Sequence, residues 1–331
     1  MSGGGPATYV ALSGGIGGAK LALGLARLLG GRLTVIVNTA DDFEHLGLMI
    51  SPDVDTTLYT LADLANPQTG WGRRDETWSF MQAIAGLGGP TWFKLGDRDL
   101  ATHVERTRRL KAGDTPTSIT AHLSQRWGIT ARVLPMTDEP VRTVVESDAG
   151  TLAFQQYFVR EQCRPVVRSL RYEGAAAARA TSAVQAALSA ATLGGVILCP
   201  SNPWLSIDPI LAVPGLRELL RSRGAPVIAV TPIIGGRAVK GPTAKIMSEL
   251  GLAPAVQSIA RHYGALLDAL VVDGVDAGLA EGLPIRTSVT NTLMQTMDDK
   301  VALARHCLAL CEQLTRASGT VGALEPVETR R

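Results

Sequence analysis

The stretch of residues 35–61 constrains this chain more than any other. A short apolar run at residues 35–37 predicts a buried strand, and polar chemistry begins directly after it. Like charges a few ångströms apart repel, so a cluster of carboxylates is costly to hold together without a cation. Divalent ions such as Mg²⁺ bind to this type of ligand, whereas an acidic loop that only turns the chain and caps a helix is the alternative. The acidic stretch contains Asp41, Asp42, Glu44, Asp53 and Asp55, together with His45.

A glycine-rich loop follows the first predicted strand. An apolar run at 9–12 leads into SGGIGGAK at residues 13–20, and a helical pattern occupies 21–29. A strand, a glycine loop and a helix N-terminus together favour phosphate binding, because backbone N–H groups approach the anion. We therefore expect Gly15 and Gly17 to tolerate no side chain. The spacing matches neither the Walker sequence nor the dinucleotide fingerprint, so a tight strand-to-helix turn is the alternative.

Three further predicted strands end in polar or glycine-containing loops. Residues 92–95 are predicted to form the third strand and run into Gly96-Asp97-Arg98-Asp99, while 196–199 run into Pro200-Ser201-Asn202-Pro203. The strand at 227–230 precedes a turn that contains Gly235. Ligands bind at the carboxyl ends of strands in open α/β sheets, so we expect these loops on one rim.

A loop at residues 70–78 is dense in Trp and Arg. Indole rings and guanidinium groups suit an aromatic ligand or a phosphate. Large aromatic side chains are more often buried than exposed, so we expect Trp71 and Trp78 to pack inward.

Strand, loop and helix patterns alternate at both ends of the 331-residue chain. Hydrophobic residues make up 46% of the chain and charged residues 19%. The alternation predicts a Rossmann-like, mostly parallel α/β sheet with helices on both faces. We expect one domain over 8–315, with an antiparallel and helical insertion at about 98–172 that covers the cleft. An alanine-rich helix is expected at 175–191 and a closing helix at 301–314. The tails at 1–7 and 318–331 are expected to be disordered.

Charge and hydropathy exclude some classes of partner. A formal net charge of +2 argues against bulk binding to nucleic acid. No apolar run approaches the roughly 18 residues of a membrane span, and we expect no secretion signal. Four cysteines without C-x-x-C spacing fit reduced thiols, so we expect a cytoplasmic protein.

Six motifs in order resemble a known family: residues 13–20, 38–42, 51–56, 94–99, 200–203 and 232–235. The chain is similar, over about 9–314, to 2-phospho-L-lactate transferase of coenzyme F420 synthesis and its phosphoenolpyruvate-using bacterial relatives. The resemblance implies that the 5′-hydroxyl of the deazaflavin Fo (7,8-didemethyl-8-hydroxy-5-deazariboflavin) attacks a guanosine diphosphate diester of an organic acid. GMP leaves, and magnesium is required. The acid, which is lactate, enolpyruvate or glycerate, stays open.

The same resemblance implies roles for particular residues, and we also expect a homodimer. Fo is expected at Asp55, Lys94, Thr56 and Trp92, and the guanosine diphosphate side at Ser13, Gly14, Gly15, Gly17, Lys20, Ser201, Asn202 and Gly235. Magnesium is expected at Asp41, Asp42 and Asp55, and catalysis at Asp55, Asp42 and Arg98.

Two alternatives have different sequence signatures. Non-enzymatic nucleotide-sugar-binding regulators of the same fold carry Gly-Gly-Ser-Ser-Gly after the paired Asp, where this chain has Phe43-Glu44-His45-Leu46-Gly47. That departure favours the enzyme. An NAD-dependent dehydrogenase is disfavoured by the glycine spacing and by the missing acidic residue at the end of the second strand.

Overall fold

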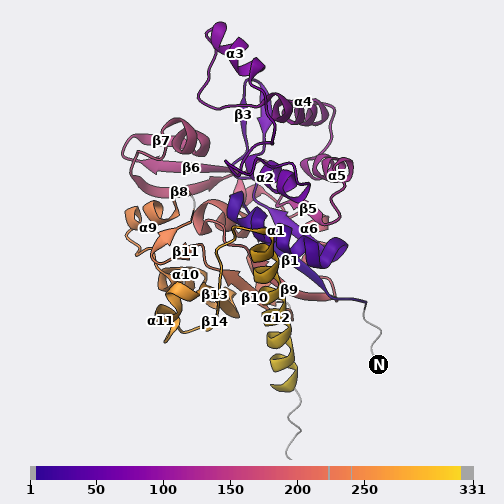
Figure 1. Ribbon diagram of the computed structural model, residues 1–331, viewed down its shortest axis with the longest axis vertical. Helices are drawn as coiled ribbons and strands as arrows, with labels where there is room; N and C mark the ends of the chain where they lie inside the picture. The colour runs from indigo at the N-terminus through magenta and orange to yellow at the C-terminus, as the bar shows by residue number, and fades with distance from the viewer. Residues whose placement is uncertain (1–4, 223, 240, 322–331) are drawn as a thin grey trace, which may run out of the picture.

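The computed structural model describes residues 5–222, 224–239 and 241–321. Its centre is a seven-stranded sheet in which every neighbouring pair is parallel (Figure 1). This confirms the predicted Rossmann-like architecture. The strand order is β14 (Arg286–Thr290), β13 (Ala269–Asp273), β10 (Val227–Val230), β9 (Leu193–Leu198), β1 (Thr8–Ser13), β2 (Leu33–Val37) and β5 (Arg132–Pro135).

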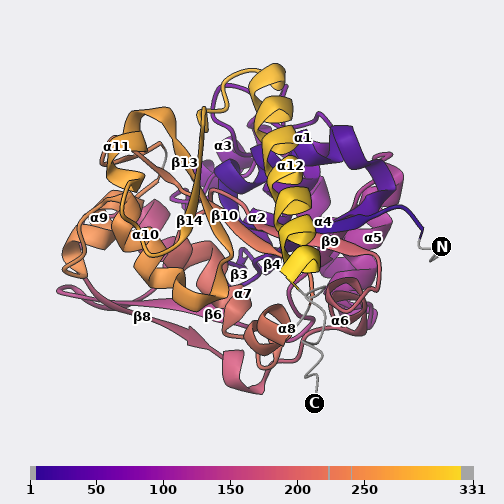
Figure 2. The ribbon, with the colours of Figure 1, turned by 90° about the horizontal axis from the view of Figure 1, so that it is seen from below.

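Alternate residues of each strand point to opposite faces of the sheet and pack in two separate hydrophobic cores, one on each face. Tyr9 and Ala11 of β1 pack with one set of helices, whereas Val10 and Leu12 pack with the other. In Figure 2, α12 lies alongside α1 on the first face. The first face carries α1 (Gly15–Leu29), α2 (Pro52–Leu61), α5 (Pro116–Arg126) and α12 (Met297–Val321), and the second carries α6 (Ser182–Leu188), α7 (Asp208–Leu211), α8 (Leu216–Ser222) and α10 (Val256–Tyr263).

The chain order reverses between β1 and β9. From β1 the chain proceeds outward through β2 to β5, and it later returns to β9 on the other side of β1. The loops that follow β1 and β9 are therefore neighbours at the carboxyl edge of the sheet. Ligands bind at such switch points, so the predicted place of the glycine loop is confirmed.

The region between β2 and β9 holds the additional structure. A hairpin of β3 (Phe43–His45) and β4 (Leu48–Ile50) precedes α2, and α3 (Ser79–Gly86) projects from the body beyond α4 (Asp97–Lys111) (Figure 1). An antiparallel sheet has the order β7 (Gly150–Ala153), β6 (Arg142–Ser147) and β8 (Val167–Glu173). The strand expected at 131–134 is not antiparallel, because β5 pairs in parallel with β2 in the main sheet.

The prediction of a strand at 92–95 is wrong. This segment is a bend between α3 and α4 that pairs with no strand of the described chain. The rings of Trp92 and Phe93 instead pack against Phe43 and His45 of the β3–β4 hairpin, with centroids 4.8–6.1 Å apart. An aromatic cluster thus accounts for an apolar run that resembled a strand.

Two helix predictions need correction. The alanine-rich stretch is a short 3₁₀ turn (Ala175–Ala177) followed by α6, because the Thr181 side chain accepts from the Val184 N–H and starts a new helix. Helix α12 extends to Val321, so the disorder expected from 318 is wrong for 318–321. Residues 1–4 and 322–331 of the expected tails lie outside the described residues.

No helix in the described residues combines the length and apolarity needed to cross a bilayer.

The remaining elements lie in the second half of the chain. The short strands and helices are β11 (Ile233–Ile234), β12 (Arg237–Ala238), α9 (Thr243–Glu249) and α11 (Ala277–Ala280).

Candidate active site

The β1 and β9 loops are tied together by one serine. The Gly14 N–H donates to Ser201 Oγ at 3.1 Å, and that hydroxyl donates back to the Gly14 carbonyl at 2.8 Å. The hydroxyl of Ser201 is therefore engaged by backbone. The neighbouring Asn202 caps the turn that follows β9 with its carbonyl oxygen, while its buried Nδ2 has no partner in the described part of the chain.

Close packing explains the glycines at the start of α1. A Cβ on Gly17 would lie 2.4 Å from the Pro200 carbonyl oxygen, and one on Gly18 would lie 2.4 Å from Ser13 Oγ. Gly15 has φ +61°, a conformation that favours glycine. The structure thus supports the expected intolerance of Gly17 and Gly15 to side chains through backbone approach and φ, whereas contact with a phosphate stays a prediction.

Asp53 links the glycine loop to the end of β2. Its Oδ1 accepts from the Gly15 N–H at 2.8 Å, and its Oδ2 accepts from Asn38 Nδ2 at 2.9 Å. Burial raises the pKa of Asp53 to about 6, although the hydrogen bonds from Asn38 and Gly15 act in the opposite direction. Sequence reasoning placed Asp53 in the acidic stretch but not among the named site residues, and the structure shows that it joins the glycine loop to the end of β2.

Asp41 and Asp42 form no ion pair within the described residues. Burial raises the pKa of Asp42 to about 7, and burial together with repulsion from Asp53 raises the pKa of Asp41 well above its ordinary value. Ser51 Oγ donates to Asp42 Oδ2 at 2.8 Å, but Oδ1 of each aspartate is buried and unpartnered among the described residues. Buried polar atoms without partners need an explanation, and coordination of a divalent cation fits this ligand chemistry.

Further unpartnered polar atoms lie beside these carboxylates. The Ser13 hydroxyl ends β1, and Thr143 lies next to the turn because its N–H donates to the Ala40 carbonyl at 2.7 Å. Within the described chain, the buried and unpartnered side-chain atoms of this rim are Ser13 Oγ, Thr39 Oγ1, Asp41 Oδ1, Asp42 Oδ1, Thr143 Oγ1 and Asn202 Nδ2.

Asp55 has a resident partner that the sequence did not indicate. Arg106 of α4 donates through both terminal nitrogens to the two carboxylate oxygens, with Nη1–Oδ2 at 3.0 Å, and both side chains are 6% exposed. His103 and Asp99 of the same helix lie beside this pair. Among the described residues, Asp55, Asp99 and His103 form the group of possible metal ligands whose ligand atoms all lie within 4.8 Å of one another. The expected trio of Asp41, Asp42 and Asp55 is not so closely grouped.

The residues expected at the acceptor side are spread over several surfaces. Lys94 is exposed, Thr56 is buried on α2, and Trp92 belongs to the aromatic cluster with His45. Arg98 is exposed, and its guanidinium lies 3.9 Å from Asp75. The guanidinium that contacts Asp55 is thus Arg106. The i, i+4, i+7 spacing of Asp99, His103 and Arg106 on one helix was the signal that could have identified it.

Two residues expected at the donor side contact other parts of the chain. Lys20 Nζ donates to the Met294 carbonyl at 2.9 Å. The Gly235 N–H donates to Asp276 Oδ2 at 2.9 Å, and Gly235 has φ +57° in the turn between β11 and β12. Their roles toward a donor stay predictions.

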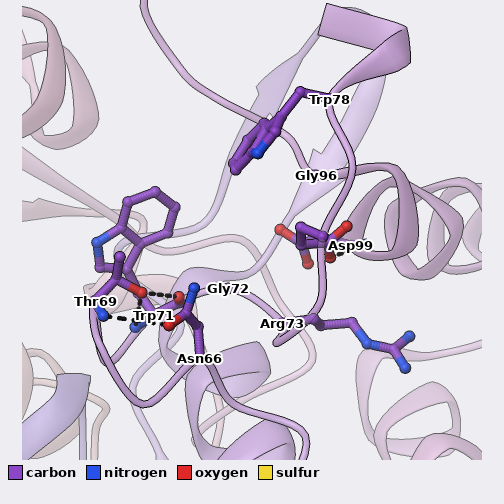
Figure 3. Close-up of a pocket in the computed structure, with 9 residues that line it drawn as sticks. Asn66, Thr69, Trp71, Gly72, Arg73, Trp78, Gly96 and Asp99 are labelled. Atoms are coloured by element: carbon purple, nitrogen blue, oxygen red, sulfur yellow. Dashed lines mark hydrogen bonds between the residues drawn. The ribbon is translucent and has the colours of Figure 1, made fainter.

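A small surface pocket lies beside the N-terminus of α4 (Figure 3). Trp71 and Trp78 line it and are 47% and 39% exposed, so the expectation that they pack inward is wrong. In Figure 3 the Arg73 side chain points away from the pocket, and its guanidinium lies over the Tyr59 and Trp127 rings. That cation–π contact anchors the loop and leaves the indoles at the surface.

The family model described as 2-phospho-L-lactate transferase CofD matches residues 9–303. The chain belongs to this family. It is 40% identical over 315 residues to a phosphoenolpyruvate transferase of Streptomyces griseus, covering 92% of this chain and 98% of that protein. A phosphoenolpyruvate transferase of Mycobacterium avium is 39% identical over 307 residues, with 83% and 90% covered.

Among solved structures, a member of the UPF0052 family from Bacillus halodurans has a TM-score of 0.60 at 14% identity, covering 92% of this chain and all of that one. This likeness concerns the fold alone. The family match confirms the resemblance found in the sequence, and the chain is an enzyme that transfers a phospho group.

Proposed function

We infer that this enzyme transfers a phosphoenolpyruvyl group from a guanosine diphosphate diester to the 5′-hydroxyl of Fo, within coenzyme F420 synthesis. The observation that carries the inference is the near full-length similarity to transferases that are named for phosphoenolpyruvate. The acceptor oxygen forms a bond to phosphorus, the bond from that phosphorus to the GMP phosphate breaks, and GMP leaves.

The rim supplies groups suited to this chemistry. Asp41 and Asp42, with their unpartnered oxygens, would hold magnesium. Bound magnesium would neutralise charge on the diphosphate. The loops that follow β1 and β9 would bind the guanosine diphosphate portion, since Asn202 Nδ2 and the Ser13 hydroxyl have no partner among the described residues.

Asp55 would orient the acceptor hydroxyl and take its proton. Each carboxylate oxygen has two lone pairs, so the contacts with Arg106 leave one lone pair on each oxygen for the hydroxyl. The two-point contact with the guanidinium fixes the orientation of the carboxylate, which sets the direction of those lone pairs. Lys94 and the exposed indoles of Trp71 and Trp78 would contact the flat deazaflavin.

The test is incubation of the protein and magnesium with Fo and, separately, guanylylated enolpyruvate, lactate and glycerate. We expect the mass of enolpyruvyl-phospho-Fo together with GMP. Product formed only from the lactate donor or only from the glycerate donor would show that the natural donor carries that acid instead of enolpyruvate. No product from any donor, together with tight binding of a nucleotide sugar, would instead support the non-enzymatic regulator.

A further inference from the structure

Helix α4 presents a row of polar side chains to α2. Asp99, His103 and Arg106 are four and three residues apart, so they lie on one helix face. Tyr59 Oη donates to Asp99 Oδ1 at 2.7 Å, and the Arg106 guanidinium spans both oxygens of Asp55. Helices α2 and α4 are thus joined by two contacts, from Tyr59 to Asp99 and from Arg106 to Asp55.

The contacts of His103 determine which ring nitrogen carries its proton. A guanidinium donates hydrogen bonds and accepts none, so the 3.2 Å contact between Arg106 Nη1 and His103 Nδ1 requires Nδ1 to be the acceptor. The proton is then on Nε2, which lies 3.3 Å from Asp99 Oδ2. The imidazole therefore contacts the guanidinium at Nη1, the nitrogen that also donates to Asp55 Oδ2, and its Nδ1 lies 3.7 Å from that oxygen.

The position of Arg106 matters because neighbouring carboxylates have no such partner. Arg106 is buried and stays charged at all relevant pH values, and its direct ion pair is with Asp55. Asp42 experiences two guanidinium groups through space, that of Arg142 more strongly than that of Arg106, and its Oδ1 is unpartnered within the described chain. A fixed positive charge next to a cation site repels an incoming divalent ion.

We propose that Arg106 is a resident counter-ion and positioning residue that holds Asp55 beside the cation site and weakens the binding of a divalent cation at Asp41 and Asp42, and that His103 braces it in that position. The inference rests on the cation site of the proposed function. It assigns to two residues of α4 the control of how tightly the cation is held. It also accounts for the difference between Asp55, which is paired by a guanidinium, and the carboxylates that follow β2.

The test is calorimetric titration of the full-length protein with Mg²⁺ alone. Arg106→Gln removes the positive charge and frees Asp55, so we expect magnesium to bind about tenfold more tightly. His103→Leu removes the brace, and we expect a gain of about threefold because the guanidinium leaves Asp55 more easily. Arg109→Gln is the matched control, since Arg109 is on the same helix but pairs with Asp114 at 2.7 Å. Its magnesium affinity should equal that of the wild type.

A general structural defect weakens ligand binding and does not tighten it, so the direction of the change separates positioning from stability. Unchanged or weaker binding by a folded Arg106→Gln would overturn the inference and leave the proposed function intact. If Arg106→Gln does not fold, unchanged magnesium affinity in His103→Leu overturns the inference in its place. Absence of magnesium binding by the wild type would overturn the cation site itself, and the inference with it.

Discussion

The acidic stretch contains two kinds of carboxylate that differ in one respect, the presence of a positively charged partner. Asp55 faces α4, where Arg106 pairs with it. Asp41 and Asp42 follow β2 and form no ion pair in the described part of the chain, although they lie only about a dozen residues from Asp55. The same residue type is thus a partner in an internal ion pair at one position and has no ionic partner among the described residues at the other. The packing of α4 determines which of these aspartates has an ionic partner.

The pKa values reflect this difference. Burial raises the pKa of Asp42 to about 7. For Asp99, burial also acts upward, but His103 and the Tyr59 hydroxyl outweigh it and lower the pKa below its ordinary value. A carboxyl whose pKa is raised and one whose pKa is lowered therefore occur in the same region of the molecule.

The largest effect on stability is expected for Asp55→Asn. The substitution leaves the buried Arg106 without its counter-ion, which should lower the free energy of unfolding by about 3–5 kcal/mol. Loss of a general base should lower turnover by about 10²–10⁴-fold. Urea unfolding and turnover of Fo measure the two effects. The double variant Asp55→Asn/Arg106→Gln should recover stability but not turnover, and wild-type turnover in Asp55→Asn would contradict the role of Asp55.

The pH dependence of stability should come from the unpaired carboxyls. The folded pKa values of Asp42 and Asp53, about 7 and about 6, lie above the value of about 3.9 for unfolded aspartate. The folded state then binds more protons between about pH 4 and 7, so the free energy of unfolding falls as pH rises through this window. We expect a contribution of about 4 kcal/mol from Asp42, measured by urea unfolding with a chelator present.

Asp42→Asn provides the control for this pH effect. The variant cannot ionise at this position, so its stability should fall less over the same pH window than that of the wild type. An identical fall in both proteins would show that Asp42 is not a source of the pH dependence.

A smaller effect is expected from Gly17→Ala. The added Cβ would lie 2.4 Å from the Pro200 carbonyl oxygen. A backbone atom can move only a little to relieve this contact, so we expect the free energy of unfolding to fall by about 1–3 kcal/mol. Gly86→Ala at the end of α3 is the control, because no atom lies within 4 Å of its Cβ position. Thermal unfolding compares the two variants, and equal stabilities would mean that the loop accommodates the side chain.

The smallest effect on stability is expected for Lys94→Met. Substitution of an exposed side chain such as Lys94 usually changes the free energy of unfolding by no more than about 0.5 kcal/mol, so the stability should be unaltered. Loss of one exposed charge should raise the KM for Fo by up to about fivefold. Lys111→Met, at the exposed end of α4, should leave KM unchanged. An unaltered KM in Lys94→Met would return Lys94 to the role of a surface residue.

The fold and the rim could be predicted because both depend on local patterns. Strand runs that end in polar or glycine-rich loops define a parallel sheet, and the β1–β9 switch point follows from it. The partner of Asp55 was not predicted, since Arg106 is 51 residues away and the ion pair depends on how α4 packs against α2. The strand expected at 92–95 failed because aromatic residues that pack in a cluster resemble those of a strand.

The measurement that tests the account most directly is urea unfolding with and without Mg²⁺ for the wild type and Asp42→Asn. A ligand that binds only the folded state, at about 100 times its dissociation constant, raises the free energy of unfolding by about 2.7 kcal/mol. We predict such a rise for the wild type and little or none for Asp42→Asn, because its cation site lacks a charged ligand. No rise in the wild type, or an equal rise in both proteins, would contradict the assignment of Asp42 to a cation site.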